Sequence, residues 1–393
     1  MALGSLLFVA IAGCARPARV EAPSPAERAP AAMARPAAPP SEAPPPSPAH
    51  EMAALRPERP PRAEVTPSAE RPSTAREALE GFGSTTTGGA GERVIVITDP
   101  SEENVRKIFK EVGQTGHATL RFAVDAPIEI TRPLPLFRAP HVTIEGGGAT
   151  LDGTNMRAQV ALIDVRTNDV IVRDLRVRNG YDNLRAQGPE AYNIVFSHVS
   201  STGAIDDGIS IGYGAHDVTV QYAFLAGNVH SIFCKYGATT NISVHHTWIQ
   251  KAIIRSPLFN GPLRADVRNV IVEDWSEWGS RFEDGATGNV IGSLWTLSPY
   301  ARAIGGKANS ALRFRNAGPV YVADTVFRGT KPGDRGDATV PFPAPPVKTL
   351  PLSRMEEFVR SHAGCLPRDR IDQAYIDATS GWRMTGREPL RVH

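Results

Sequence analysis

Cysteine is nearly absent from this sequence of 393 residues, which holds only Cys14, Cys234 and Cys365. An odd and sparse set excludes a disulfide framework, and the lack of any CxxC spacing excludes the usual zinc motifs. Cys234 and Cys365 could form a disulfide, but the sequence alone does not decide this. The length is sufficient for one large domain or two of average size.

A strong charge of either sign is also lacking. Lys and Arg together number 43 and Asp and Glu number 41, so the formal net charge is only +2. This balance gives no global basic field, and we therefore expect no nucleic-acid partner. An acidic partner would have to be bound by cations that the fold brings together locally.

Long hydrophobic runs are missing as well. The apolar stretch from Leu3 to Ala12 is too short to span a bilayer, and it leads into Ile11-Ala12-Gly13-Cys14. Small residues before a lone cysteine resemble a bacterial lipobox, in which the cysteine becomes the lipidated N-terminus. We therefore predict a signal peptide with a lipobox over residues 1–14. The alternative is a plain signal peptide that happens to contain a cysteine.

This leader predicts a secreted protein or an outer-membrane-anchored lipoprotein of the bacterial cell envelope, which touches a membrane only through its N-terminal lipid. Residues 15–75 follow, rich in Pro, Ala, Glu and Arg, as in "AAPPSEAPPPSP". Such a composition forms neither a helix nor a central strand, and it has too few large apolar residues to order itself. We predict a disordered linker there and one folded domain over residues 76–393.

Within that domain, a polar turn residue followed by alternating apolar residues recurs, mostly at intervals of about 20–28 residues. Alternation of period two predicts strands with one buried face, and short strands at this interval predict a solenoid with one coil per repeat. Helical patterns between the strands and tight hairpin signals are both scarce, which argues against a doubly wound sheet and a β-sandwich. The segments are "NDVIVRDLRV" from Asn168, "YNIVFSHVSS" from Tyr192, "HDVTVQYAFL" from His216, "TNISVHHTWI" from Thr240, "RNVIVEDWSE" from Arg268, "GNVIGSLWTL" from Gly288 and "VYVADTVFRG" from Val320.

Four asparagines share one place when these repeats are aligned, and we expect them to stack and exchange amide hydrogen bonds from coil to coil: Asn193, Asn241, Asn269 and Asn289. Two amphipathic segments predict short helices. "SEENVRKIFKEVG" from Ser101 is placed to cap the N-terminal end of the solenoid, and "SRMEEFVRSHAG" from Ser353 to pack back on the coils.

Four motifs, in order along the chain, resemble polysaccharide lyase family one, the pectate lyases. They are "GFGSTTTGG" from Gly81, "NIVFSHVSSTGAIDDGISI", "ISVHHTWIQKAIIRSPL" and "HAGCLPRDRIDQ". The resemblance implies an all-β fold, a right-handed single-stranded parallel β-helix with short capping helices. It also implies a lyase that cleaves an acidic, polygalacturonate- or pectin-like polysaccharide by calcium-assisted β-elimination. We expect such a protein to be a monomer.

The family's chemistry removes the C5 proton of a uronic acid, so the site needs a cation on the neighbouring carboxylate, a base and further positive groups. Calcium prefers carboxylate oxygens, and Asp182, Asp206 and Asp207 are the candidate ligands. If Ile209 and Ile211 point inward, Asp206 points outward and Asp207 inward. Carboxylates on adjacent coils, about 4.8 Å apart, could share one ion. The alternative is that these aspartates cap turns.

Arg255, in "RSPL", matches the arginine that the family uses as its base, although arginine is normally protonated. Lys235 is a displaced counterpart of a family lysine, whose aligned position is Ile232, and we assign it a catalytic role. His230 and Asn260 are candidates for substrate binding, and Asn260 replaces a second family arginine. Two further departures are Ser197 and Ser210, which stand where the family has acidic residues.

His245 and His246 look like a metal pair, but adjacent strand residues point to opposite faces and do not easily share a ligand. We expect His246, and similarly His198, to be buried in a stack of neighbouring side chains. Two other functions remain open. "IDDGISI" also resembles the inverting polygalacturonases, which would require further aspartates. The departures from the family pattern also allow a non-catalytic glycan-binding surface lipoprotein.

Overall fold

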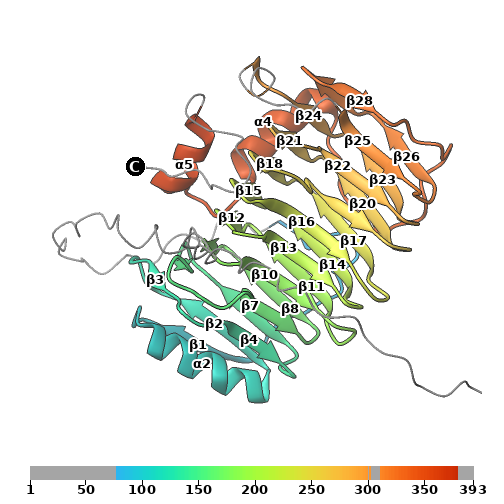
Figure 1. The fold of residues 1–393 in the computed structure, drawn as a ribbon. Coiled ribbons are helices and arrows are strands. Elements are labelled where there is room, and N and C mark those ends of the chain that lie inside the picture. Colours follow the sequence, from blue (N-terminus) through green and yellow to red (C-terminus); the bar gives the residue numbers. More distant parts are fainter. Residues whose placement is uncertain (1–76, 300, 302–309, 379–393) are drawn as a thin grey trace, which may run out of the picture. The chain divides into compact units, whose positions relative to one another are not determined.

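The computed structural model describes residues 77–299, 301 and 310–378. The predicted leader at 1–14 and linker at 15–75 lie outside these residues. The described strands all pair in parallel and form three sheets, which we call A, B and C (Figure 1). The first two strands both belong to sheet A. From the second strand onward the chain visits sheets A, B and C in turn, so each of these coils contributes one strand to each sheet. The predicted parallel β-helix is therefore confirmed.

The strands of sheet A are, in spatial order, β1 (Arg93–Ile97), β2 (Ala118–Phe122), β5 (Val142–Glu145), β8 (Val170–Arg173), β11 (Tyr192–Ser197), β14 (His216–Gln221), β17 (Thr240–His245), β20 (Arg264–Arg268), β23 (Thr287–Ile291) and β26 (Val320–Ala323). The strands of sheet B are β3 (Ile128–Glu129), β6 (Thr150–Asp152), β9 (Arg176–Arg178), β12 (Ser200–Thr202), β15 (Phe224–Ala226), β18 (Trp248–Gln250), β21 (Ile271–Glu273), β24 (Leu294–Thr296) and β27 (Val326–Arg328). The strands of sheet C are β4 (Leu134–Phe137), β7 (Ala161–Arg166), β10 (Asp182–Gln187), β13 (Asp207–Gly212), β16 (His230–Lys235), β19 (Leu258–Asn260), β22 (Ser280–Glu283), β25 (Ser310–Arg315) and β28 (Lys331–Gly333).

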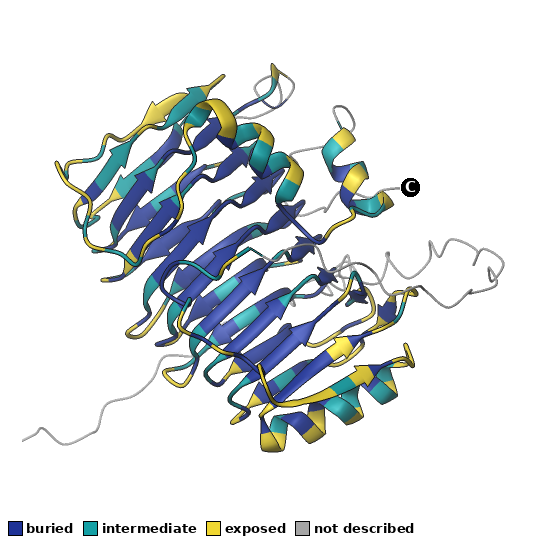
Figure 2. Cartoon of the chain, turned by 180° about the vertical axis from the view of Figure 1, so that it is seen from behind, coloured by how far each residue is buried: buried dark blue, intermediate teal, exposed yellow. Residues whose placement is uncertain are grey.

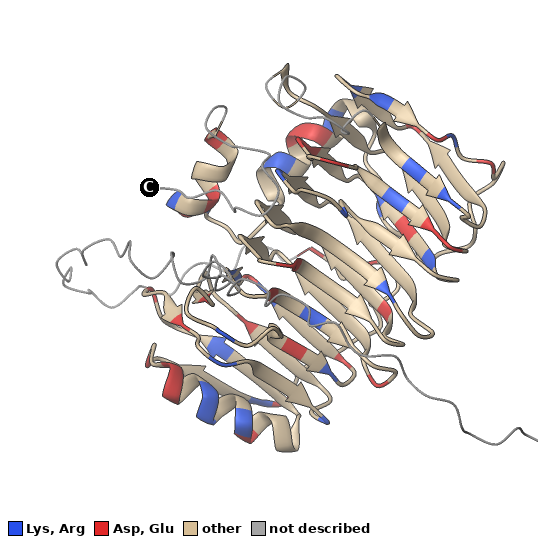
Figure 3. Cartoon of the chain, in the orientation of Figure 1, with Lys and Arg blue, Asp and Glu red and all other residues tan. Residues whose placement is uncertain are grey.

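The apolar residues of the repeats fill the interior of the coils. In sheet A, Val218 of β14 pairs with Ile242 of β17 and Val220 pairs with Val244, and all four side chains are buried in one core cluster. The same level of the stack is buried from coil to coil (Figure 2). Charged residues of both signs are spread over the coils rather than gathered on one sheet (Figure 3), as the near-neutral composition predicts.

Most of the repeat segments span one strand of sheet A and the next strand of sheet B, joined by a bend. One residue at each bend has a positive φ, as at His198, Tyr222, His246 and Asn269. The segment from Arg268 is offset, because Arg268 ends β20 and only β21 follows within it. Asn269 therefore lies on a bend, which the repeat alignment placed incorrectly.

The predicted ladder of asparagine amides is wrong. Asn193 and Asn241 share one level of sheet A, but Asp217 of the coil between them separates them. Asn289 and Asn269 lie at other places on the coil. The Nδ2 of Asn241 donates to Asp217 Oδ1 at 2.8 Å, and that of Asn289 donates to Asp266 Oδ1 at 2.8 Å. Asn193 approaches Asp169 in the same way at 3.5 Å. The coil-to-coil bonds join an amide to a carboxylate, which gives a charge-assisted hydrogen bond instead of an amide pair.

Both predicted helices are present. Helix α2 (Glu102–Thr115) is N-capped by the Ser101 side chain and places Val105, Phe109 and Val112 in the core at the N-terminal end of the stack (Figure 1). Helix α4 (Leu352–His362) packs Met355 and Val359 against apolar residues of sheet B. The described cysteines, Cys234 and Cys365, are buried and free, so they do not pair.

A further helix, α5 (Arg370–Asp377), was not predicted. It is attached to sheet B by Arg178, whose guanidinium donates to Asp369 at 2.8 and 2.9 Å and to Asp372 at 2.7 Å. Arg178 and Asp372 are almost completely buried, so this ion cluster holds the C-terminal segment on the coils. None of the described helices is long and apolar enough to cross a membrane.

The N-terminal strap, residues 77–91, runs across sheet A and contains the "GFGSTTTGG" motif. Its backbone is bound by hydroxyl side chains of the sheet: Phe82 N–H donates to Ser243 Oγ at 3.0 Å and Gly83 N–H to Thr219 Oγ1 at 2.9 Å. A Cβ at Gly83 would stand 2.3 Å from the carbonyl oxygen of Ile194. The motif thus needs glycine because its backbone lies directly on the sheet.

Candidate active site on sheet C

A pocket on the outer face of sheet C contains most of the residues that the sequence singled out. It is lined by Tyr181, Asp182, Arg185, Asp206, Asp207, Ser210, Ile211, Gly212, Tyr213, Phe233, Lys235, Tyr236 and Arg255. Asp182, Asp206 and Arg255 come from different coils, and the stacking of those coils brings them into one groove, as predicted.

The alignment follows from the register of the sheet. Asp182, Asp207 and His230 are the first residues of β10, β13 and β16, and Asp207 pairs directly with His230. His230 in turn bridges to Ile254, which precedes Arg255. The backbone N–H of Asp207 donates to Asp182 Oδ1 at 3.2 Å. Adjacent coils therefore present their polar side chains at one level of the stack.

His230 lies between the two adjacent aspartates. Its Nδ1 is 2.5 Å from Asp206 Oδ1 and 3.1 Å from Asp207 Oδ1. Burial disfavours the imidazolium, but the contacts with Asp206 and Asp207 outweigh it and raise the pKa of His230. Burial likewise opposes ionisation of Asp206, yet the hydrogen bond from His230 prevails and lowers the pKa of Asp206. The predicted substrate-binding histidine thus neutralises part of the acidic cluster.

The pKa of Asp182 shifts in the opposite direction to that of Asp206. Its side chain is almost fully buried, and burial together with the negative charge of Asp207 raises the pKa of Asp182 to about 7. The Arg185 guanidinium is 3.7 Å away but is bound at 2.9 Å by Asp164, so it compensates Asp182 only partly. The negative charge of the Asp182 carboxylate is therefore only partly neutralised by the cations that line the pocket.

Arg255 reaches the same cluster from the opposite side. Its Nη1 donates to Asp207 Oδ1 at 3.1 Å, and its Cζ lies 4.0 Å from the centre of the Phe233 ring. The Arg255 backbone has a φ of 62°, an uncommon conformation for a bulky residue and one that recurs at functional positions. Asp207 was expected to point inward. It is buried, but its carboxylate faces the pocket, because it begins a strand at the corner of the coil.

The two remaining candidates differ in position. Lys235 lines the pocket, with its Nζ 5.1 Å from the centre of the Tyr236 ring. Asn260 lies outside the described lining, and its amide donates to Asp284 Oδ2 at 2.8 Å. The two serines that replace acidic residues of the family lie in different places. Ser210 lines the pocket, whereas Ser197 belongs to sheet A and accepts a hydrogen bond from Gln221.

Two groups of side chains within the described residues have ligand atoms within 4.8 Å of one another. The first is Asp206, Asp207 and His230 in the pocket. Its carboxylates suit a hard cation such as calcium, and Asp182 adds a third oxygen ligand close by, whereas the imidazole nitrogen is a poor calcium ligand. The excess negative charge at Asp182 is what a bound cation would relieve, so these residues fit calcium.

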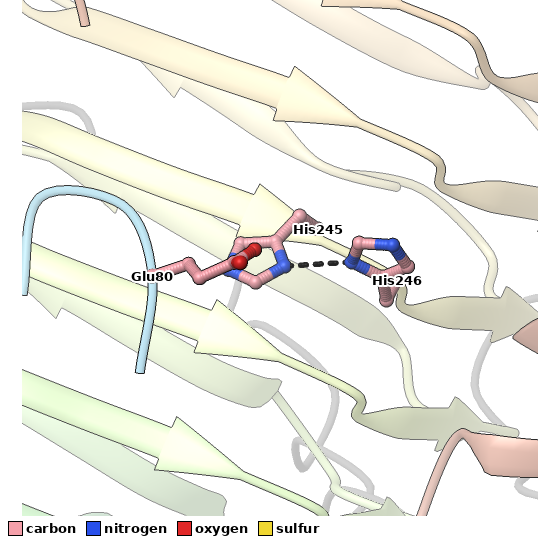
Figure 4. Close-up of side chains that lie close together, drawn as sticks. All are labelled: Glu80, His245 and His246. Atoms are coloured by element: carbon pink, nitrogen blue, oxygen red, sulfur yellow. Dashed lines mark hydrogen bonds between the residues drawn. The ribbon is translucent and has the colours of Figure 1, made fainter. Parts of the chain in front are cut away.

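The second group is Glu80, His245 and His246, on sheet A and the strap (Figure 4). The expectation that the two histidines point apart is wrong. The positive φ at His246 turns its ring back, and the two Nδ1 atoms share a hydrogen bond of 2.9 Å. The predicted stack is confirmed, because His246 stacks on Tyr222 at 4.9 Å and Tyr222 on His198 at 4.8 Å.

Sequence reasoning missed several lining residues. Arg185 stands three residues after Asp182 on the same strand, and Tyr181 hydrogen-bonds Asp206. Tyr213 and Tyr236 each directly follow a strand of sheet C. The signal that could have identified these tyrosines is their equal offset from "DGISIG" and "HSIFCK", once those segments are recognised as neighbouring strands.

Comparison with known proteins gives consistent matches, although no protein-family model matches the chain. The chain is 26% identical over 230 residues to a probable pectate lyase C of Aspergillus flavus, and the match covers 56% of this chain and 54% of the relative. A probable pectate lyase C of Emericella nidulans is 27% identical over 228 residues, covering 56% and 52%. The chain spans about half the length of the curated relatives it matches.

Solved structures share the fold. A pectate lyase from Bacillus sp. N165, in complex with trigalacturonate, has a TM-score of 0.54 at 15% identity, and the match covers 73% of this chain and 98% of that one. The major allergen of cedar pollen has a TM-score of 0.56 at 15% identity, with 73% and 92% covered. At these identities the structural matches support the β-helix fold alone.

Proposed function

From the relationship of this chain to pectate lyases, we propose that it is a polysaccharide lyase that cleaves an acidic, pectin-like polymer by β-elimination. The observation that carries the proposal is the pocket on sheet C, where Asp182, Asp206 and Asp207 meet Arg255 and Lys235. Carboxylates that can hold a cation, a guanidinium and an ammonium are the groups that elimination next to a uronate carboxylate requires.

Asp206 and Asp207, with Asp182 beside them, are the residues that would hold calcium. A cation held by these residues would supply electrostatic stabilisation of the negative charge that develops beside the substrate carboxylate as the C5 proton leaves. The protein's own cations add to this stabilisation, since Lys235 lines the same pocket and can bind a second uronate carboxylate.

Arg255 is the proposed base, and its guanidinium must be uncharged before it can accept a proton. That guanidinium lies 3.1 Å from Asp207. Engagement of Asp207 as a ligand would withdraw that partner from Arg255. The face of Phe233 below the guanidinium keeps it oriented and partly shielded from water. Once its guanidinium has released a proton to solvent, Arg255 is the group positioned to take the C5 proton. The electron pair of the C5–H bond then forms the C4–C5 double bond as the C4–O bond breaks.

A glycoside hydrolase is the second candidate, and one observation favours it. The pKa of Asp182 is raised to about 7 while that of neighbouring Asp206 is lowered, a division that suits a general acid and a general base. The buried position of Asp182 and its acceptance of the Asp207 N–H argue against the acid role, because the carboxyl is already engaged.

The products distinguish the two reactions. Incubation with polygalacturonate and with methylated pectin, followed by mass spectrometry of the fragments, should reveal a fragment with an unsaturated sugar at its new end. Fragments that have all gained water would support the hydrolase and contradict the lyase. Retention of substrate without any fragments would support the non-catalytic glycan-binding protein.

The proposal extends to location and assembly. A pectin-like polymer is encountered outside the cell, which agrees with export through the predicted leader and attachment by lipid at Cys14. We propose a monomer that acts on an acidic polysaccharide, with the linker at 15–75 as a tether and no nucleic-acid partner. Metabolic labelling with a fatty acid, compared with a Cys14→Ser variant, tests the anchor: unlabelled wild-type protein would contradict it.

A further inference from the structure

Two tyrosines form an exposed pair at the edge of the sheet C pocket. Tyr213 and Tyr236 both line the pocket, and they remain 54% and 45% exposed. Their rings stack on each other, with centroids 4.8 Å apart and an interplanar angle of 29°. Contiguous exposed aromatic surface is typical of ligand-binding sites, and here it adjoins a candidate catalytic pocket.

The backbone at these positions makes tyrosine an unexpected choice. Each tyrosine is the first residue after a strand of sheet C, where the chain bends with a positive φ of 56° at Tyr213 and 74° at Tyr236. The same bend is made on four other coils by residues that tolerate a left-handed backbone, and on the coil of β4 by Arg138; the four are Gly188, Gly261, Asp284 and Asn316. Of the described bends that follow strands of sheet C, only the two beside the pocket carry an aromatic ring, and each holds it at the expense of backbone strain.

The pair is also connected to the proposed catalytic centre. Arg255 lies over the face of Phe233, and Phe233 meets Tyr236 edge to face at 5.8 Å. Tyr236 then stacks on Tyr213, while Lys235 lies beside the Tyr236 ring. An aromatic surface therefore leads from the guanidinium to the edge of the pocket, with one ammonium group along it.

We propose that Tyr213 and Tyr236 form a stacking platform for a pyranose ring of the polysaccharide, a subsite that binds the uncharged face of a sugar rather than its carboxylate. This inference rests on the proposed function and specifies where the polymer lies relative to Arg255. A pyranose presents C–H groups on its faces and hydroxyls at its rim, which match an aromatic face with a phenolic hydroxyl. Rings with a purely structural role are expected in the core, where Phe196, Phe259 and Phe282 are fully buried.

The test uses the full chain and replaces both tyrosines with the residue that adjoining coils carry, as Tyr213→Gly/Tyr236→Gly. Tyr192→Ala is the matched control, because Tyr192 stacks on His216 at 5.2 Å on sheet A, away from the pocket. Calorimetry with oligogalacturonates and with their methyl esters, at low and high salt, gives the affinity of each. Thermal unfolding of each variant reports whether the fold is kept.

The platform predicts that the double variant binds both kinds of oligomer more weakly by the same factor, about 3- to 10-fold, at either salt concentration. Its melting temperature should stay the same or rise, because glycine relieves the strain. Lys235→Ala, by contrast, should weaken binding of the acidic oligomers selectively and in a salt-dependent manner.

Unchanged affinity in the double variant, or an equal loss in Tyr192→Ala, would overturn the platform. So would a loss limited to acidic oligomers. Suppose that the wild-type protein binds oligomers but cleaves none, and that the double variant binds them more weakly as predicted. The platform then stands and the lyase proposal fails. If it binds neither kind of oligomer, both fail.

Discussion

Replacement of Arg255 by alanine separates its catalytic role from its structural one. The change removes the Arg255 ion pair with Asp207 and the contact with the Phe233 ring. Asp207 is only 5% exposed, so the loss of one partner leaves a buried carboxylate less well compensated. His230 still approaches it at 3.1 Å, which limits the damage.

The structural loss can be bounded. Breaking a fully buried ion pair typically costs about 3–5 kcal/mol, but Arg255 is 26% exposed and Asp207 keeps its histidine. We therefore expect a loss of about 1–3 kcal/mol in the free energy of unfolding. A protein stable by about 5–15 kcal/mol remains folded after such a loss. Loss of a general base, in contrast, lowers the rate by about 100- to 10,000-fold.

The assay follows formation of unsaturated product on polygalacturonate, with urea unfolding of the same preparations. Arg264→Ala is the control, because Arg264 lies exposed on sheet A and bonds to Asn241. We expect kcat to fall by at least about 100-fold in Arg255→Ala and to stay unchanged in the control. Substantial activity in a folded Arg255→Ala protein would remove Arg255 from the mechanism.

Three further outcomes are expected. Chelation should abolish cleavage and calcium restore it, and Asp206→Asn should raise the calcium needed for half-maximal rate by about tenfold; activity indifferent to chelator would refute the assigned ligands. Arg178→Ala should lower the free energy of unfolding by about 2–4 kcal/mol in urea titrations, because the buried Asp372 keeps only the longer 3.6 Å contact with Arg176; a loss below about 1 kcal/mol would contradict the clamp. Burial lowers the pKa of His246 from 6.5 to about 4, so the unfolded chain binds the proton more readily and the free energy of unfolding should fall as the pH drops from about 7 to 4. The variant His246→Phe can still stack on Tyr222, and it should lose up to about 3 kcal/mol of that pH dependence. Identical pH profiles in the wild type and the variant would disprove the assignment.

The coiled architecture was accessible from the sequence because its signal is local. The alternation in "HDVTVQ" and "TNISVH" buries Val218, Val220, Ile242 and Val244, and that pattern needs no knowledge of distant contacts. The helix at 102–115 was equally visible, since Ser101 caps it and its apolar residues recur at helical spacing.

What the sequence did not reveal depends on backbone bends and on contacts between distant segments. A positive φ at His246 reverses the expected direction of its ring, and alternation alone cannot predict such a bend. Helix α5 is short, and it is held by Arg178 from nearly two hundred residues earlier. The offset of Asn269 arose because one strand of a coil was mistaken for another.

The candidate site was predicted at the level of its coils but not of its contacts. Asp182, Asp206 and Arg255 were expected in one groove, because parallel strands align equivalent residues, and they line one pocket. The position of His230 between Asp206 and Asp207 could not be foreseen, since it depends on a side-chain rotamer. Asn260 was expected at the substrate, but Asp284 of the next coil binds its amide.

The most direct test of the central proposal is a time course of ultraviolet absorbance with polygalacturonate and calcium, run in parallel on the wild-type protein, Asp206→Asn and Arg255→Ala. At the calcium concentration that half-saturates the wild type, aligned coils that bring these side chains into one elimination centre predict a rising absorbance from unsaturated ends in the wild type. They predict a much slower rise in Asp206→Asn and a loss of the signal in Arg255→Ala. An unchanged signal in either folded variant, or cleavage without any ultraviolet-absorbing product, would contradict the proposal.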